Sequence, residues 1–391
     1  MTALDTRLRG VADGYINQDL YAGIGWQVEK AGEVIALGAA GTSDEARETP
    51  LGEDAIYRIY SMTKPIVSFM ALMLVERGQL RLSDFLMQHI PAFAGIQVLG
   101  EGGLERPARP VTIEDLITHR SGISYDFVPG CPIGQQYAEI NLLNRVDLSL
   151  EEFANQIAAI PLAFHPGSEW RYSFSIDVLA RVLEVASGQS IDQLLAENIF
   201  EPLGMGDTGY SVPAEKQARL LPLFGFESID LSFEVPPPHD LNLVDGEAIY
   251  PSQTGHNALR GGHGLFSTCA DYIKFATMLL DGRTPDGTPL VSPAMHELMV
   301  ANRIPDHQLP MSLGPMAFPG YGHCLIGRVM QDLGQAMSLT AAGEFGWEGA
   351  AGTYFWVDRE NQLVGVFMTQ FLATYLPFRD DMRSAVYAML K

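Results

Sequence analysis

The distribution of apolar and polar residues predicts a helix and then a β-hairpin at the start of the chain. Apolar residues recur at helical spacing among charged ones over residues 4–20, which predicts an amphipathic helix. Two β-prone runs follow, at 23–30 and 33–38, and the pair Ala31-Gly32 separates them as a tight turn would. A short extended run, 56–60, comes next and is expected to be a strand.

The last part of the chain predicts more strands and a closing helix. Strand-like runs lie near 345–347, at 353–357 and at 363–369, and the polar turn 358–361 joins the last two. An apolar pattern of helical period then covers 375–390.

Between these ends the pattern is mainly helical. Ser, Thr or Asp precedes several of the apolar runs at a helix-capping position. Residues 207–258 are irregular, and Pro236-Pro237-Pro238 indicates a long loop there. The expected helices are 82–89, 112–119, 150–160, 173–187, 191–200, 270–280 and 292–300.

Strands at both ends of the chain, with helices between them, predict an α+β fold. The simplest arrangement pairs the terminal strands in one antiparallel sheet flanked by helices. Residues 1–80 and 259–391 would then form the lobe that carries the sheet. Residues 81–258 would form a mostly helical second lobe with an irregular insertion at 206–258. A site is expected in the cleft between the lobes.

Composition narrows the possible functions. The chain has 391 residues, of which 47% are hydrophobic and 18% charged, as in a globular protein with a large core. Its formal net charge of −22 disfavours binding to nucleic acid or to anionic membranes. The first ten residues lack the apolar core of a signal peptide, so a cytoplasmic location is expected. The three cysteines, Cys131, Cys269 and Cys324, show no metal-type spacing, and neither a metal nor a cofactor is predicted.

The run from Ile56 to Glu76 contains the first candidate chemistry. The extended segment ends at Ser61, where an apolar helical run begins, so Ser61 is expected at a helix N-terminus. Residues three apart share one helix face, which would bring the Lys64 ammonium within reach of the Ser61 hydroxyl. A serine needs a neighbouring base to become a nucleophile, and burial in an apolar helix would lower the pKa of a lysine enough for that task. A chance match of two common residues is the alternative reading.

Three motifs in order extend this pattern over nearly the whole chain. Ser61-Met62-Thr63-Lys64, Tyr172-Ser173-Phe174 and Trp347-Glu348-Gly349 resemble the three motifs of the serine β-lactamase and penicillin-binding protein superfamily. In particular the chain resembles the family VIII carboxylesterases, which share the class C β-lactamase fold, from about residue 10 to 388. The resemblance implies a β-lactamase/transpeptidase-like fold. It also implies that Ser61 accepts the acyl group while Lys64 and Tyr172 move its proton, with Lys64 supplying the positive charge that a Tyr172 phenolate would need.

The third motif implies an oxyanion hole and part of the substrate pocket. By resemblance, the backbone N–H groups of Ser61 and Ala350 would hold the oxyanion, and Gly349 would let substrate approach the strand closely. A strand packed tightly against a helix is the plainer explanation for these small residues. Trp347 stands where relatives carry lysine or histidine, and an exposed Glu348 beside it is expected to repel anionic substrates such as penicillins.

Other residues complete the expected pocket. Phe174 replaces an asparagine that holds the substrate amide in many relatives, which favours esters over lactams and peptides. Tyr125 is a further substrate-binding candidate. His119 is expected to be structural, and His263 either lines the pocket or braces its loop. The remaining candidates for an apolar pocket, most of which are expected in the core, are Phe127, Phe345, Tyr354, Met311 and Met316.

These observations predict a serine hydrolase that cleaves neutral carboxylic esters of short to medium acyl chain through an acyl-enzyme on Ser61. Its partner would be a small-molecule ester, and the sequence leaves monomer and homodimer open. The alternatives are an acyltransferase of the same fold, a D-amino-acid amidase or peptidase, and a weak β-lactamase. A binding protein without catalysis is disfavoured, because such a protein gains nothing from a base beside a serine.

Overall fold

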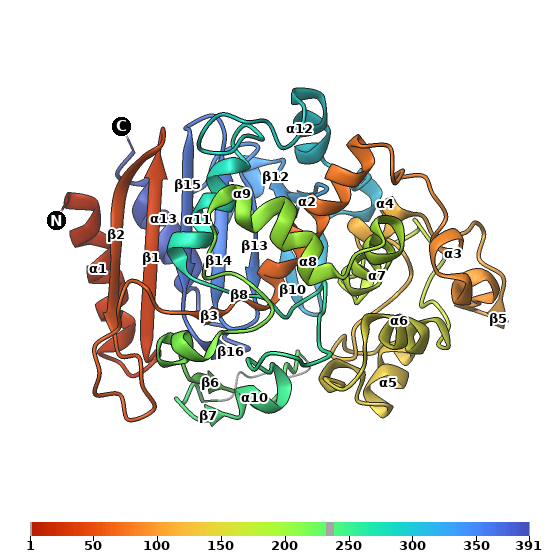
Figure 1. The fold of residues 1–391 in the computed structure, drawn as a ribbon, viewed down its shortest axis with the longest axis horizontal. Coiled ribbons are helices and arrows are strands. Elements are labelled where there is room, and N and C mark those ends of the chain that lie inside the picture. Colours follow the sequence, from red (N-terminus) through yellow and green to blue (C-terminus); the bar gives the residue numbers. More distant parts are fainter. Residues whose placement is uncertain (1, 232–237, 391) are drawn as a thin grey trace.

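The computed structural model describes residues 2–231 and 238–390, and a seven-stranded antiparallel sheet forms its centre (Figure 1). Gly25 of β1 lies opposite Met368 of β15, which confirms the predicted sheet built from both ends of the chain. Residues 232–237 of the predicted insertion, including Pro236 and Pro237, lie outside the described residues. In sheet order the strands are β11 (Tyr321–His323), β12 (Arg328–Met330), β13 (Phe345–Gly349), β14 (Thr353–Asp358), β15 (Leu363–Met368), β1 (Gly23–Lys30) and β2 (Glu33–Gly41).

The central strands are buried on both faces of the sheet. Along β14, Tyr354 and Trp356 belong to the core beneath α1 (Ala3–Ile16) and α13 (Phe378–Tyr387). The intervening Phe355 and Val357 belong to the larger core on the opposite face. Because successive side chains of a strand point to opposite faces, the near-continuous apolar runs seen in the sequence are those of strands covered on both sides.

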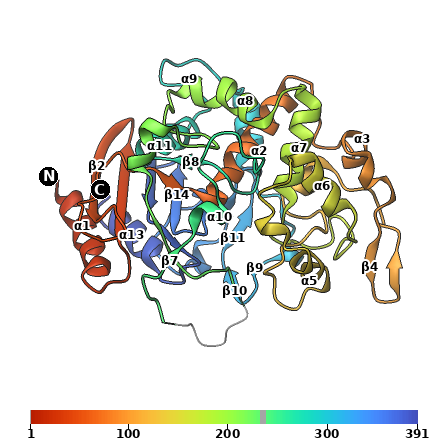
Figure 2. The same ribbon diagram turned by 60° about the horizontal axis from the view of Figure 1, so that its bottom comes forward.

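Helices cover both faces of the sheet and build the second lobe (Figures 1 and 2). The largely buried α2 (Thr63–Glu76) and α11 (Cys269–Met278) lie on the face opposite α1 and α13, and α2 continues into the helical lobe beside α7 (Ser175–Ser187) (Figure 1). The bounds of the remaining helices are α3 Leu86–His89, α4 Ile113–Ile117, α5 Pro132–Glu139, α6 Leu150–Ala158, α8 Ile191–Leu195, α9 Glu201–Leu203, α10 Gly246–Ile249 and α12 Pro293–Val300.

Several predicted elements are shorter than expected. The helix predicted at 82–89 is reduced to α3, because the Asp84 side chain accepts a hydrogen bond from the Arg81 N–H and forms a turn instead. The strand predicted at 56–60 is only β3, Tyr57–Arg58, and pairs with β8, Phe266–Ser267. The closing helix begins at Phe378 rather than 375, directly after Pro377, and the helix α5 was not predicted.

Short strands join parts that lie far apart in the sequence. β6 (Leu223–Gly225) pairs with β16 (Phe371–Leu372) and with β7 (Leu243–Val244), so the irregular segment is attached beside the C-terminal part of the chain. Two small hairpins, β4–β5 (Val98–Gly100, Gly103–Glu105) and β9–β10 (Met311–Leu313, Met316–Phe318), complete the strands. The lobe boundaries at 81 and 258 remain a prediction.

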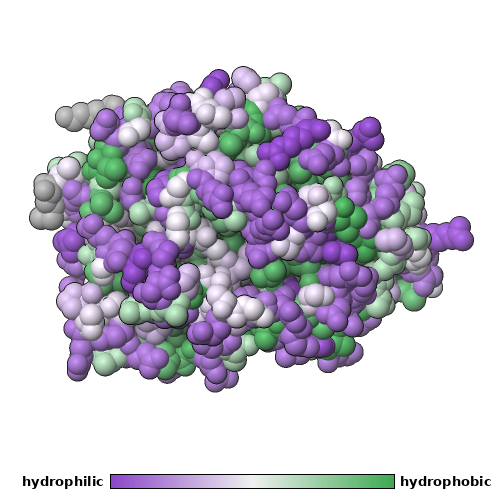
Figure 3. All heavy atoms as spheres, in the orientation of Figure 1, coloured by the Kyte–Doolittle hydropathy of each residue, from purple (hydrophilic) through white to green (hydrophobic). Residues whose placement is uncertain are grey.

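The face of the molecule seen in Figure 3 is mostly hydrophilic, with small hydrophobic areas scattered over it. Among the described residues, no helix has the length and apolar character needed to cross a membrane. Hydrophobic side chains are gathered instead in the two cores on either side of the sheet.

Candidate active site

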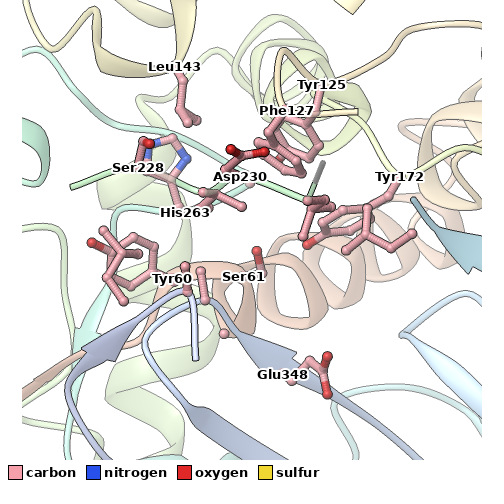
Figure 4. Close-up of a pocket in the computed structure, with 18 of the residues that line it drawn as sticks. Tyr60, Ser61, Tyr125, Phe127, Leu143, Tyr172, Ser228, Asp230, His263 and Glu348 are labelled. Carbon is pink, nitrogen blue, oxygen red and sulfur yellow. The ribbon is translucent and has the colours of Figure 1, made fainter. Parts of the chain in front are cut away.

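A cavity of about 450 Å³ contains most of the residues that the motifs indicated (Figure 4). Its wall includes Ser61, Tyr172 and the segment from Trp347 to Ala350, which come from the turn before α2, from the loop before α7 and from the end of β13. Ser61 lies near the middle of the view, between the aromatic pair Tyr125 and Phe127 and the strand that carries Glu348 (Figure 4). The tertiary structure therefore gathers segments nearly 300 residues apart around one serine.

Ser61 lies in the short 3₁₀ turn Tyr60–Met62 that runs directly into α2. The turn replaces the helical N-terminus predicted for this serine, and Tyr60 adopts a positive φ of 44° to make the bend. The Lys64 Nζ atom lies 3.0 Å from the Ser61 Oγ atom, which confirms the predicted proximity. Pro65 lies within the first turn of α2, where its missing N–H has no helical partner to lose.

The Lys64 side chain is buried, with 4% of its surface exposed. Burial lowers its pKa to about 7, although the Asp177 carboxylate opposes that effect. The ammonium donates a hydrogen bond of 2.7 Å to the Gly262 carbonyl and lies 4.6 Å from the centre of the Tyr172 ring. A neutral Lys64 amine is therefore accessible near pH 7, within hydrogen-bonding distance of a serine hydroxyl.

Asp177, on the first turn of α7, is a buried carboxylate to which the sequence motifs assigned no role. Its Oδ1 atom accepts the Gly262 N–H at 2.8 Å, and its Oδ2 atom has no hydrogen-bond partner among the described residues. Burial raises the pKa of Asp177, and the Lys64 charge opposes this rise. A Cβ atom at position 262 would overlap Asp177, so glycine is required for this approach. An acidic residue within the apolar run Ile176-Asp177-Val178 was the available sequence signal.

Tyr172 is 7% exposed and accepts a hydrogen bond of 3.3 Å from the Trp347 indole N–H. Burial raises the pKa of its phenol, and hydrogen bonds with Ser61 and Trp347 only partly offset the rise. The resemblance implied a Tyr172 phenolate stabilised by a Lys64 ammonium, and that role stays a prediction; burial favours the neutral phenol, and a Lys64 with a pKa of about 7 is only partly charged at neutral pH. Burial therefore favours the protonated form of the Tyr172 phenol.

The end of β13 lies against the turn that carries Ser61. The Thr353 hydroxyl donates to the Ile59 carbonyl at 3.1 Å, and a Cβ atom at Gly349 would overlap both groups. Gly349 thus allows close packing of the strand against the segment before Ser61, rather than against a helix as the plainer interpretation of the sequence had it. Ala350 follows it and lines the cavity together with Ser61.

Glu348 was expected to be exposed, and the structure places it in a partly exposed position with two charged partners. The Glu348 side chain is 26% exposed, and its Oε2 atom lies 3.1 Å from Arg328 Nη1 and 2.6 Å from Arg379 Nη1. Burial alone would raise the pKa of Glu348, but Arg379 and Arg328 together hold it below its ordinary value. Sequence reasoning missed both arginines, because they come from β12 and α13 and meet only in the folded protein.

The aromatic candidates divide between the cavity and the core. Tyr125 and Phe127 line the cavity as a stacked pair with ring centres 4.5 Å apart. Phe174 has no exposed surface, and the centre of its ring lies 4.3 Å from that of Tyr125. Because Phe174 does not line the cavity, its prediction as a substrate contact is wrong. The Phe174 ring fills an apolar core, where its burial is favourable. Of the other candidates, Met316 lines the cavity, whereas Phe345, Tyr354 and Met311 are buried away from it.

The histidines do not form a Ser-His pair around Ser61. His119 is buried, and its Nδ1 atom lies 3.1 Å from the Ser173 hydroxyl, which agrees with a structural role. His263 lines the cavity, and burial lowers its pKa to about 3, so the ring is neutral at physiological pH. Among the described residues, no group of His, Cys, Asp and Glu side chains is arranged to hold a metal ion.

Comparisons with known proteins agree with this architecture. Residues 8–387 match the Beta-lactamase family. The chain is 32% identical to Protein Rv1367c of Mycobacterium tuberculosis, over 88% of this chain and 84% of that protein. It is 28% identical to Esterase EstB of Burkholderia gladioli, over 99% of this chain and 96% of EstB.

A solved structure extends the comparison to three dimensions. The structure described as "EstCE1, a hydrolase with promiscuous acyltransferase activity" superposes with a TM-score of 0.82 at 24% identity, over 98% of each chain. The similarity to EstB also confirms the predicted resemblance to esterases of this fold. The chain therefore belongs to the beta-lactamase family, as its three ordered motifs predicted.

Proposed function

We propose that this protein is a serine esterase that hydrolyses neutral carboxylic esters through an acyl-enzyme on Ser61. The observation that carries the proposal is the 3.0 Å contact between Ser61 Oγ and the Nζ atom of Lys64, a buried lysine whose pKa is lowered to about 7. EstB, which matches along nearly the whole chain, is named as an esterase and supports the same reaction class.

The residues suggest an order of proton transfers. Neutral Lys64 takes the Ser61 proton while Oγ attacks the ester carbonyl carbon. The N–H groups of Ser61 and Ala350 would hold the resulting oxyanion. As the intermediate collapses, the bond to the alkoxy oxygen breaks and Tyr172 gives that oxygen its proton. Lys64 then returns a proton to Tyr172, which leaves a neutral acyl-enzyme and a free alcohol.

Deacylation would reverse these roles with water as the nucleophile. Water attacks the acyl carbon and loses a proton to the Tyr172–Lys64 pair, the bond to Ser61 Oγ breaks, and Oγ regains its proton. The cavity of about 450 Å³ and its aromatic wall favour short to medium acyl chains. The proposal includes a cytoplasmic location and a small-molecule ester as the substrate.

Acyl transfer is the second candidate, and one observation favours it. EstCE1, whose fold superposes along 98% of this chain, is described as having promiscuous acyltransferase activity. An alcohol that entered the same cavity could take the place of water at the acyl-enzyme. Hydrolysis in the presence of added alcohols, with ester products quantified, would separate the two outcomes.

The test compares p-nitrophenyl butyrate with the chromogenic cephalosporin nitrocefin, using the wild type and Ser61→Ala. We expect rapid ester turnover that is lost in Ser61→Ala, and slow or absent nitrocefin cleavage. Full activity in Ser61→Ala would refute the nucleophile. Preferential cleavage of nitrocefin would make the protein a β-lactamase instead. A fluorophosphonate that failed to label Ser61 would favour a binding protein.

A further inference from the structure

Acidic side chains outnumber basic ones around the cavity. Arg328 and Arg379 are the only lysine or arginine residues among the described residues that line it, and both pair with the Glu348 carboxylate. Three further acidic residues, Asp126, Glu227 and Asp230, also line the cavity. A substrate therefore meets four carboxyl groups and two guanidinium groups, and both guanidinium groups already have a carboxylate partner.

The arginine pair is held firmly in place. The Arg328 guanidinium lies between the Tyr321 and Tyr354 rings, at 5.0 and 5.1 Å from their centres, and its side chain is 8% exposed. The Arg379 side chain, at the start of α13, is 23% exposed and faces the cavity. Because the Glu348 carboxylate accepts hydrogen bonds from both guanidinium groups, it lies where an anionic group of a substrate would otherwise bind.

We propose that Glu348 excludes anionic substrates by occupying both arginines of the cavity wall, and so restricts the enzyme to esters without a free carboxylate. This inference rests on the proposed esterase function and adds to it the residues that select neutral over anionic esters. A substrate carboxylate could bind Arg379 only by displacing Glu348 or by lying beside its charge, and both are unfavourable in a partly desolvated site. The low pKa of Glu348 keeps this carboxylate ionised at neutral pH.

Two p-nitrophenyl esters of nearly equal size test the proposal: mono-p-nitrophenyl glutarate, which is anionic, and its neutral methyl ester. The measured quantity is the ratio of kcat/KM for the anionic ester to that for the neutral one. For the wild type we expect a ratio below about 0.1, since like charges in a site discriminate strongly. For Glu348→Gln, which keeps the size of the side chain, we expect the ratio to rise by about tenfold or more, because both arginines can then bind the substrate carboxylate.

Matched variants distinguish two reasons for a rise in the ratio: that the arginines become free to bind substrate, or that the cavity simply loses negative charge. Glu227→Gln removes one carboxylate from an exposed position on the same cavity and should change the ratio by less than about threefold, since exposed charges are screened. Adding Arg379→Gln to Glu348→Gln should cancel the gain. An equal rise in Glu227→Gln, or a gain that survives loss of Arg379, would overturn the proposal.

Two further outcomes keep the test decisive. If Glu348→Gln does not fold, as judged by circular dichroism, Glu348→Thr is the second variant. Equal turnover of the two esters by the wild type overturns the proposal whatever the variants do. If the wild type hydrolyses neither ester in a Ser61-dependent way, the proposed esterase function fails, which is distinct from a failure of anion exclusion.

Discussion

Asp177 and Glu348 are two carboxylates of one site in opposite surroundings. Asp177 is fully buried, and one of its oxygen atoms lacks a hydrogen-bond partner among the described residues. Glu348 is partly exposed and has two arginine partners. Burial raises the pKa of Asp177, whereas the arginines hold that of Glu348 low. The same chemical group thus serves two purposes, because counter-charge and not burial alone decides its state.

The comparison extends to the basic residues on each side. Near Asp177, Lys64 is desolvated and has its pKa lowered to about 7, which suits proton transfer. Near Glu348, Arg328 and Arg379 stay charged and paired, so they provide fixed positive charge at the cavity wall. The site thus has a proton-transfer half, Lys64 and Asp177, in which the proposed mechanism moves a proton. It also has a fixed-charge half, Glu348 with its two arginines, in which the charges stay in place.

The largest effect on activity is expected from replacing Lys64 in the proton-transfer half. Lys64→Met should lower kcat/KM for p-nitrophenyl butyrate by about a thousandfold at pH 8, as expected for loss of a general base. Lys64→Arg keeps the positive charge but has no accessible neutral form, so it should be similarly inactive. Retained activity in Lys64→Arg would show that the charge of Lys64 matters rather than its basicity.

The next largest effect is expected from a change in the fixed-charge half, and the measured quantity is the free energy of unfolding. Glu348→Gln leaves the buried Arg328 without its carboxylate, so the free energy of unfolding should fall by about 2 kcal/mol. Asp177→Asn should cost less, because it replaces a buried carboxylate that lacks a full set of partners by a neutral group of equal size. Urea denaturation of both variants measures the difference. A larger loss in Asp177→Asn would reverse the comparison.

The dependence of activity on pH sharpens the comparison. In the proposed mechanism Lys64 must be neutral to accept the serine proton, so kcat/KM should rise with pH through about 7 and then level off. Asp177 raises the Lys64 pKa, so Asp177→Asn should move this acidic limb to lower pH by about one unit. Glu348→Gln should leave the limb in place. A limb that does not move in Asp177→Asn would mean that Asp177 only supports the structure.

The smallest effect is expected from replacing Trp347, which contacts both halves of the site. Trp347 lies next to Glu348 on β13 and donates its indole N–H to Tyr172. Trp347→Phe removes this single hydrogen bond and should lower kcat by about five- to tenfold, the effect of one neutral hydrogen bond. Steady-state kinetics at pH 8 measure the change. A loss as large as that of Lys64→Met would place Trp347 among the essential groups.

The fold was predictable where local pattern and burial agree. The hairpin at 23–41, the three strands of the C-terminal half and the caps Thr112, Ser149, Thr268 and Ser292 follow from short-range rules of periodicity and capping. The helix α5 and the short strands β6, β11 and β12 escaped prediction, because only their partners in the folded chain define them.

For the site, the sequence by itself determined the reacting types of side chain and one geometric fact. Ser61 and Lys64 are three residues apart, so local backbone geometry brings them together. Everything farther apart was decided by the tertiary structure. It placed Gly262 and Asp177 beside Lys64, withdrew Phe174 into the core, and brought Arg328 and Arg379 to Glu348. The physical reason is that desolvation and charge pairing depend on neighbours in space, and sequence spacing encodes such neighbours only within a few residues.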